Sequence, residues 1–201
     1  MFEELFSATK LMAGAMLGDI KLINFVYDDK GRFCNHSMCC SVLWKDMQNA
    51  NHPSPKKQIT KEKITTSMKY DLKFLQGVLN SSLIKFYVKE LLHDGLHFYP
   101  EHQKQLPIPK INAKNQKIAD KIVNLVDKIL ESKAQGKDCH TEHSEVSKNI
   151  ESKRDISPMA QYDKRKKLQN DKIINDLESQ INDLVYKLYD LDSHEIQIIE
   201  N

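Results

Sequence analysis

The residue types that could bind a metal or act as nucleophiles gather in two stretches of the sequence. They are Cys34, His36 and Cys39 in the apolar stretch CNHSMCCSVLW, and Cys139, His140 and His143 in a polar stretch. Zinc is usually held by pairs of Cys or His at short, regular spacings, which this pattern does not have. We therefore predict small buried thiols and no metal site, with a zinc site as the less favoured alternative.

No catalytic motif is evident in the sequence. It contains no GxGxxG or GxxxxGK phosphate-binding loop and no GxSxG nucleophile elbow. His93, His97 and His102 flank Gly95 and Pro100 and could touch a phosphate or a base edge, but loop histidines are common at protein surfaces. We predict no catalytic residue and no cofactor in this chain.

Basic side chains are unevenly placed, although the formal net charge is only +2. Clustered lysines suit contacts with phosphates, whereas Arg, Asn and Gln side chains can read base edges in a duplex. The candidate DNA contacts are Arg32, Asn49, Asn51, Lys56, Lys57, Gln58, Lys61 and Lys63. A solvated charged loop is the simpler alternative for any one of them.

The composition is that of a chain with enough apolar residues for a core. Of its 201 residues, 40% are hydrophobic and 29% are charged. No apolar run approaches the roughly 20 residues of a membrane helix, and the acidic start MFEELF lacks the basic region of a signal peptide. We expect a soluble cytoplasmic protein that does not engage a membrane.

The first part of the chain has the character of strands. Residues 20–27, IKLINFVY, are apolar and β-branched, and the polar turn 28–31 follows them. Because the strand-like stretch RFCNHSMCCSVLW comes next, the pattern predicts a β-hairpin closed at Gly31. The stretch 48–63 holds two prolines and four lysines, and it is predicted to be a solvated loop.

From Lys69 onward the apolar residues recur at helical spacing. One helical face runs from Leu72 to Leu79 and another from Leu83 to Leu91, and the triplet Asn80-Ser81-Ser82 is predicted to end the first helix and cap the second. Residues 93–105 are predicted to be irregular or a short strand. In QLPIPKI (105–111), two prolines impose an extended step, whose apolar side chains should pin it to the core.

Two long stripes of apolar residues follow this proline step. Their seam residues are Ile118, Ile122, Leu125 and Ile129 in the first stripe, and Ile174, Leu177, Ile181, Leu184 and Leu188 in the second. The three–four spacing favours an antiparallel coiled-coil hairpin, with two helices packed on the domain core as the alternative. The polar, aperiodic residues from about 135 to 163 are predicted to be a flexible insert.

These elements predict an α+β fold with two parts. Residues 1–110 would form a small mixed domain, and residues 111–201 a long antiparallel helical hairpin. The proline step would be the joint between them.

Two stretches of the chain carry motifs of a known family. They are KFLQGVLNSSLIKFYVKELLHDGLHFYPEHQKQLPIPKI (73–111) and LESQINDLVYKLYDLDSHEIQIIEN (177–201), with a weaker match over KLMAGAMLGDIKLINFVYDDKGRFCNHS. In their order and spacing they resemble the C-terminal specificity domain of TaqI-like DNA methyltransferases and fused type IIG restriction-modification enzymes. Asp190, in the turn after the long helix, departs from the pattern, because the family usually has Gly there.

The resemblance implies a target-recognition domain that binds double-stranded DNA and docks a methyltransferase or restriction subunit. The Asn-Pro-Pro-Tyr, Phe-x-Gly-x-Gly and nuclease motifs of such enzymes are missing, so adenine-N6 methylation or cleavage, with its S-adenosylmethionine and Mg²⁺, would belong to the partner. The alternative is a truncated, non-catalytic fragment that acts only as a helical protein–protein interaction module and could form a homodimer.

Overall fold

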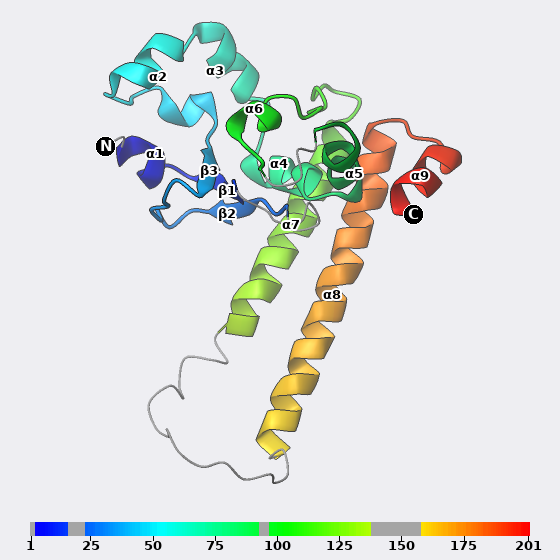
Figure 1. The fold of residues 1–201 in the computed structure, drawn as a ribbon. Coiled ribbons are helices and arrows are strands. Elements are labelled where there is room, and N and C mark those ends of the chain that lie inside the picture. Colours follow the sequence, from blue (N-terminus) through cyan, green and yellow to red (C-terminus); the bar gives the residue numbers. More distant parts are fainter. Residues whose placement is uncertain (1–2, 16–22, 93–96, 138–157) are drawn as a thin grey trace.

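The computed structural model describes residues 3–15, 23–92, 97–137 and 158–201. These residues form an α+β fold, as expected: a small antiparallel sheet, a group of short helices, and two long helices that run away from the body and back (Figure 1). The predicted fold class is therefore confirmed.

The sheet is built around a strand that the sequence pattern did not reveal. β1 (Lys10–Gly14) lies between β2 (Val26–Asp28) and β3 (Met38–Ser41), and it pairs antiparallel with both. The predicted hairpin between the second and third of these segments is therefore wrong. The chain does turn at Gly31, whose φ of +66° suits glycine, but it then passes to the opposite edge of β1.

The stretch 48–63 is also different from the expected loop. It contains α2 (Pro53–Gln58) and the start of α3 (Lys61–Ser67), and a 3₁₀ helix, η2 (Trp44–Met47), precedes them. Proline is tolerated in the first turn of a helix, because the backbone N–H groups there have no intrahelical partner. Thr60 caps α3, since its side chain accepts a hydrogen bond from the backbone N of Lys63. Short helices with these caps can form without an apolar stripe.

The next two helices are where the pattern placed them. α4 (Leu72–Leu79) ends at Asn80, and α5 (Ser82–Leu91) begins after Ser81, whose hydroxyl accepts a hydrogen bond from the backbone N of Ile84. The predicted role of the Asn-Ser-Ser triplet is confirmed. In the region predicted as irregular, residues 93–96 lie outside the described residues, and α6 (Pro100–Gln103) is a short helix.

The proline step is extended and held at alternate carbonyl groups by tyrosines from other elements. The Tyr87 hydroxyl donates to the carbonyl of residue 105, Tyr189 to that of Pro107, and Tyr70 to that of Pro109. Leu106 is buried and Ile108 is half-buried against the core. The expected anchoring of this step by its apolar side chains is confirmed.

The two long helices are α7 (Gln116–Lys137) and α8 (Pro158–Leu188), and they run antiparallel (Figure 1). Because the ends of the expected insert, 135–137 and 158–163, are helical, the prediction of an unstructured segment is wrong there; residues 138–157 lie outside the described residues. Far from the body, the Asn170 side chain still donates a hydrogen bond to the Ser132 carbonyl at 3.0 Å.

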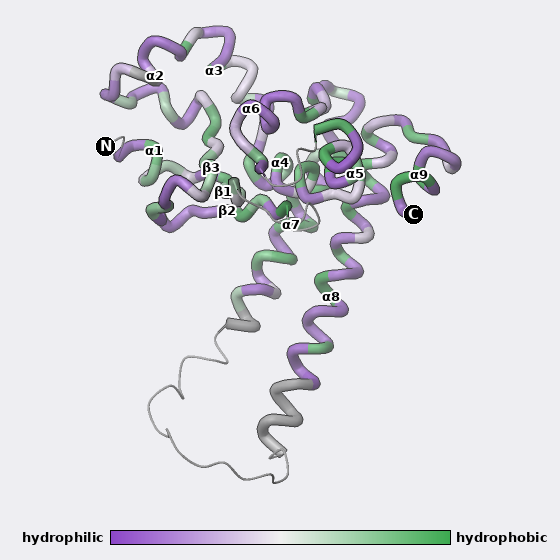
Figure 2. Tube along the Cα trace, viewed as in Figure 1, coloured by the Kyte–Doolittle hydropathy of each residue, from purple (hydrophilic) through white to green (hydrophobic). Residues whose placement is uncertain are grey.

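The predicted seam residues all face the interior, but to different degrees. Ile122, Ile129 and Ile181 are buried. The half-buried members are Ile118, Leu125, Ile174, Leu177, Leu184 and Leu188. In α7 the buried line is completed by Ala119 and Val126. Away from the body, α8 is mostly hydrophilic (Figure 2).

The root of the helical pair belongs to the core of the body. α4 packs on α7 so closely that a Cβ placed on Gly77 would lie 2.5 Å from Ile122 Cγ2 and 3.2 Å from Val126 Cγ2. One hydrophobic cluster runs from Leu11 in the sheet to Val185 in α8. The long helices therefore leave the body from a shared core.

After α8 the chain makes a left-handed turn into α9 (Ser193–Glu200). Asp190 has φ +54°, and the backbone N of Leu191 donates to the carbonyl of Tyr186 at 3.1 Å. This six-to-one bond and left-handed residue end a helix in the way that glycine usually does. The structure thus keeps, with Asp190, the backbone conformation that glycine favours.

Candidate nucleic-acid interface

A group of exposed basic side chains lies on α2 and α3. We call it the lysine surface, and its members are Lys56, Lys57, Lys61 and Lys63; the exposed amide of Gln58 lies among them. Residues 44–73 contain seven lysines against three acidic residues, whereas the whole chain has a formal charge of only +2. This segment therefore carries a net positive charge, as contacts with phosphates require.

Lys63 is the most constrained member of the lysine surface. Its Nζ donates to the Gln58 carbonyl at 2.8 Å and lies 4.8 Å from the centre of the Trp44 ring. A cation over an aromatic face is attracted by the ring's negative π-surface. Lys63 thus ties α2, α3 and η2 together, while Lys56, Lys57 and Lys61 extend into solvent.

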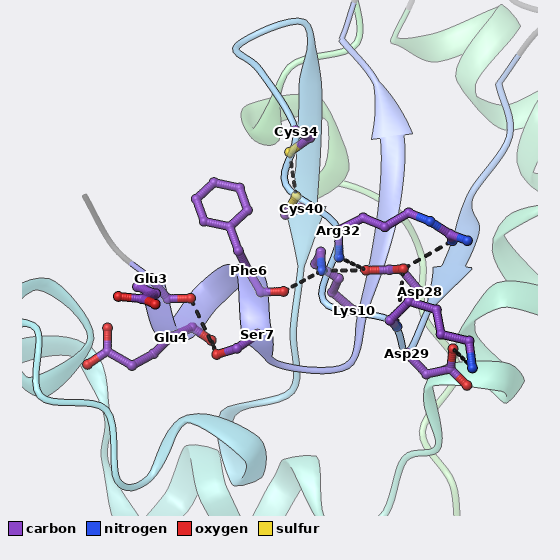
Figure 3. Close-up of polar contacts among 11 residues, drawn as sticks. Glu3, Glu4, Phe6, Ser7, Lys10, Asp28, Asp29, Arg32, Cys34 and Cys40 are labelled. Atoms are coloured by element: carbon purple, nitrogen blue, oxygen red, sulfur yellow. Dashed lines mark hydrogen bonds and ion pairs between the residues drawn. The ribbon is translucent and has the colours of Figure 1, made fainter.

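Arg32 is held in a different part of the molecule, beyond the end of β2. Its guanidinium lies 3.2 Å from Asp28 Oδ1, and its backbone N donates to Asp28 Oδ2 at 2.9 Å (Figure 3). Asp28 is fully buried and also receives Lys10 Nζ at 2.5 Å. The β2 end of the sheet is separated from α2 and α3 in Figure 1, so Arg32 does not extend the lysine surface.

The charge on Asp28 is maintained against its burial. Burial alone would raise the pKa of this carboxyl group. Hydrogen bonds from Lys10 and from the backbone amides of Arg32 and Lys30 outweigh that effect, and they lower the pKa below its usual value. The carboxylate therefore acts as a fixed anchor for the first strand and for the loop that carries Arg32.

The two candidate asparagines, Asn49 and Asn51, are exposed in the connection that leads into α2. The backbone N of Asn51 donates to Glu4 Oε1 at 2.9 Å, which leaves its side-chain amide to face solvent. They precede the lysine surface directly in the chain. Seven of the eight predicted DNA contacts thus lie on α2, on α3 or in the connection between η2 and α2. The eighth, Arg32, lies elsewhere.

A cleft that sequence reasoning missed opens beside the lysine surface. It has a volume of about 580 Å³, and α3, η2, α4 and the proline step line it. Trp44 and Tyr70 contribute aromatic side chains, Leu75 and Ile108 apolar ones, and Lys63 a cation. A cleft of this make-up can take a flat or apolar group while the cation contacts an anion. In the sequence, the one feature that could have indicated this cleft is the chain's single tryptophan, Trp44.

The sulfur and imidazole groups are arranged as follows. Among the described residues, no three His, Cys, Asp or Glu side chains are placed to hold a metal ion. His36 is exposed, and Cys39 Sγ points to the Phe98 carbonyl at 3.8 Å. The second half of the considered zinc set, at 139–143, lies outside the described residues, as does His93.

The two other candidate histidines belong to a stack of rings next to α6. The ring of His97 stacks on Tyr99 at 4.8 Å between centroids. His102 Nδ1 accepts a hydrogen bond from the backbone N of Tyr99 at 3.2 Å. These contacts give both imidazoles a packing role.

Two further findings concern the membrane and the similarity of this chain to known proteins. Within the part of the chain that the structure describes, no helix combines the length and the apolar character needed to cross a membrane. No family model, curated protein or solved structure matches the chain. Its function therefore has to be inferred from its own residues and their arrangement.

Proposed function

We propose that this protein is the DNA sequence-specificity module of a restriction-modification system. It would bind duplex DNA through the lysine surface and dock a methyltransferase or endonuclease partner. The observation that carries the proposal is the cluster of four exposed lysines on α2 and α3, a stretch (53–67) with only one acidic residue, Glu62. The order of the sequence motifs in 73–111 and 177–201 supports it.

Lys56, Lys57 and Lys61 are the residues we assign to phosphate contacts. Their side chains are exposed to solvent. Each lysine that neutralises a phosphate releases condensed counterions, so binding weakens steeply as salt is added. Such contacts position a protein on DNA without reading its sequence.

Base reading is assigned to the exposed amides next to these lysines. Gln58, Asn49 and Asn51 carry side chains that can pair bidentately with adenine in the major groove. Arg32 would contribute less, because its guanidinium is already paired with Asp28. The chemistry of methylation or cleavage is assigned to the partner, which would bring S-adenosylmethionine and Mg²⁺.

Binding of fluorescent duplexes, measured by anisotropy over a range of salt, tests this proposal. We expect K56A/K57A/K61A to lower the salt slope by about 2.7, since each contact contributes about 0.9, and to weaken binding at 0.1 M salt by up to about 500-fold. The matched control K121A/K172A/K187A removes three exposed lysines from the long helices and should leave affinity within about twofold. Equal losses in both variants, or no binding by the wild type at low salt, would refute the proposal.

A second function is favoured by a different observation. α8 exposes two apolar side chains on its far half, Leu168 (73% exposed) and Ile173 (44% exposed). An interaction module that uses the long helices would cover such residues in a complex or a homodimer. Sedimentation of a stable dimer that has no affinity for DNA would favour this second function over the first.

A further inference from the structure

Two cysteines face each other across the turn that leads into β3. Cys34 precedes the turn and Cys40 lies on the strand, with their sulfur atoms 3.0 Å apart (Figure 3). The neighbouring Cys39 points elsewhere, toward the carbonyl of Phe98 at 3.8 Å. The structure thus separates one close pair of thiols from a third cysteine that is adjacent in sequence.

The pair is brought together by contacts that do not involve sulfur. The backbone N of Met38 donates to the Asn35 carbonyl at 3.2 Å, and the backbone N of Ser37 donates to Asn35 Oδ1 at 3.1 Å. The Ser37 carbonyl accepts from the backbone N of Ala15, at 2.8 Å, next to the end of β1. The turn is therefore fixed to the sheet, and the two thiols remain close by virtue of the backbone.

We propose that Cys34 and Cys40 form a reversible thiol–disulfide pair, which closes on reaction with a small-molecule disulfide of the glutathione class. The Cys34 thiolate attacks one glutathione sulfur, a Cys34–glutathione disulfide forms, and one glutathione thiolate leaves. Cys40 then loses its proton to solvent and attacks Cys34 Sγ, which releases the second glutathione thiolate. Two protein thiols are oxidised to one disulfide while one glutathione disulfide is reduced to two thiols.

The order of these steps follows from the surroundings of the two sulfurs. Burial and the hydrogen bond with Cys34 raise the pKa of Cys40 to about 12, so Cys40 is not the first nucleophile near neutral pH. Burial also raises the pKa of Cys39. Once Cys34 carries glutathione, the reaction of Cys40 is intramolecular, and closure should outpace formation of the adduct.

Closure would bond the loop after β2 covalently to β3. That loop carries Arg32 and the exposed Phe33, whose ring stacks on Phe6 in α1 (Glu3–Ser7) at 4.9 Å between centroids. A disulfide here would restrict the loop and, through Phe33, the first helix. This inference stands independently of DNA binding.

Intact-protein mass spectrometry of the folded full chain, treated with glutathione disulfide, tests the proposal. The variant C39S/C139S keeps only Cys34 and Cys40, and we expect a monomer that has lost two hydrogens and regains them with dithiothreitol. The matched control C40S/C139S keeps Cys34 and Cys39, and it should stop at one glutathione adduct. Far-UV circular dichroism identifies variants that have kept their helices.

Other products overturn the proposal. They are a C39S/C139S chain that keeps both thiols, one that retains a stable glutathione adduct, or one that forms a linked dimer. Equally fast loss of two hydrogens by C40S/C139S would show that the Cys34–Cys40 contact gives no selectivity. If C39S/C139S loses its helices, the wild-type chain is oxidised instead and its disulfide is located by peptide mapping. A disulfide other than Cys34–Cys40 in that chain would also overturn the proposal.

Discussion

Substitution of Lys10 by Met should lower the free energy of unfolding substantially, because it removes the partner of a buried carboxylate in the sheet. The Lys10 side chain is completely buried, and its Nζ lies 2.5 Å from Asp28 Oδ2 and 2.6 Å from the Phe6 carbonyl (Figure 3). Methionine matches the length of the aliphatic part but brings no positive charge. The variant therefore leaves a buried carboxylate without its strongest partner.

The magnitude follows from what Asp28 retains. Breaking a buried ion pair costs about 3–5 kcal/mol. Because the backbone amides of Lys30 and Arg32 still donate to Asp28, we expect the lower end of that range, about 3 kcal/mol, for K10M. In a chain of this size, that corresponds to a fall of about 6–12 °C in the melting temperature.

Urea and thermal unfolding followed by circular dichroism measure this effect. The control is K30M, because Lys30 Nζ makes a solvent-exposed pair with Asp29 at 3.7 Å, and its loss should cost less than about 0.5 kcal/mol. The double variant K10M/D28N should be less destabilised than the sum of its single variants. A K10M protein as stable as K30M would refute this account of the buried pair.

The same pair sets a dependence of stability on acid. The folded-state pKa of Asp28 is lowered, so its contribution is present above the unfolded pKa of about 3.9 and is lost as pH falls through the lower folded pKa. The D28N variant lacks this pH-dependent contribution, because an asparagine side chain does not titrate. The stability difference between wild type and D28N should therefore shrink as the pH is lowered below about 4. A difference that stays constant from pH 6 to pH 2 would contradict the assignment.

Three further substitutions probe the joints between the helices, each measured by urea unfolding. Gly77→Val should cost about 3 kcal/mol, because even a Cβ would lie 2.5 Å from a methyl group of Ile122, and more than any gain in helix propensity. Tyr189→Phe should cost about 1 kcal/mol through its lost hydrogen bond to the Pro107 carbonyl; an unchanged midpoint would rule that bond out. Asp190→Gly should instead stabilise the chain by about 0.5–1 kcal/mol, since glycine adopts its φ of +54° without strain, and a loss of stability would contradict that reading.

Helices α4, α5, α7 and α8 were predictable because their signals are local. Capping residues indicate the boundary between α4 and α5 at Asn80-Ser81. Apolar residues spaced three and four apart indicate the long helices. The sheet was not predictable in the same way. β1 begins with a lysine that is buried only because Asp28, 18 residues further along, neutralises it, and no local pattern indicates such a pair.

In the candidate site, too, some features were evident in the sequence and others arise only from the fold. Lys56, Lys57 and Lys61 were identifiable because clustered charge is visible in a sequence whatever structure it adopts. The helices that present them were missed, since α2 and α3 are short and neither carries an apolar stripe, although Thr60 caps α3. The cleft at Trp44 could not be foreseen, because its walls come from segments that only the folded chain brings together.

The lysine surface and the far end of the long helices lie at opposite ends of the molecule (Figure 1). A duplex on α2 and α3 would therefore leave α7 and α8 open to a partner, and the two ligands would not compete for space. Coupling between them would pass through α4, which touches both long helices and is tightly packed at Gly77, or through the proline step, where the Pro107 carbonyl accepts a hydrogen bond from Tyr189. A packed core without a second arrangement transmits little, so DNA should change partner affinity by less than about 1 kcal/mol. A larger coupling, measured by titrating the partner with and without DNA, would require that the root of the hairpin adopts a second packing.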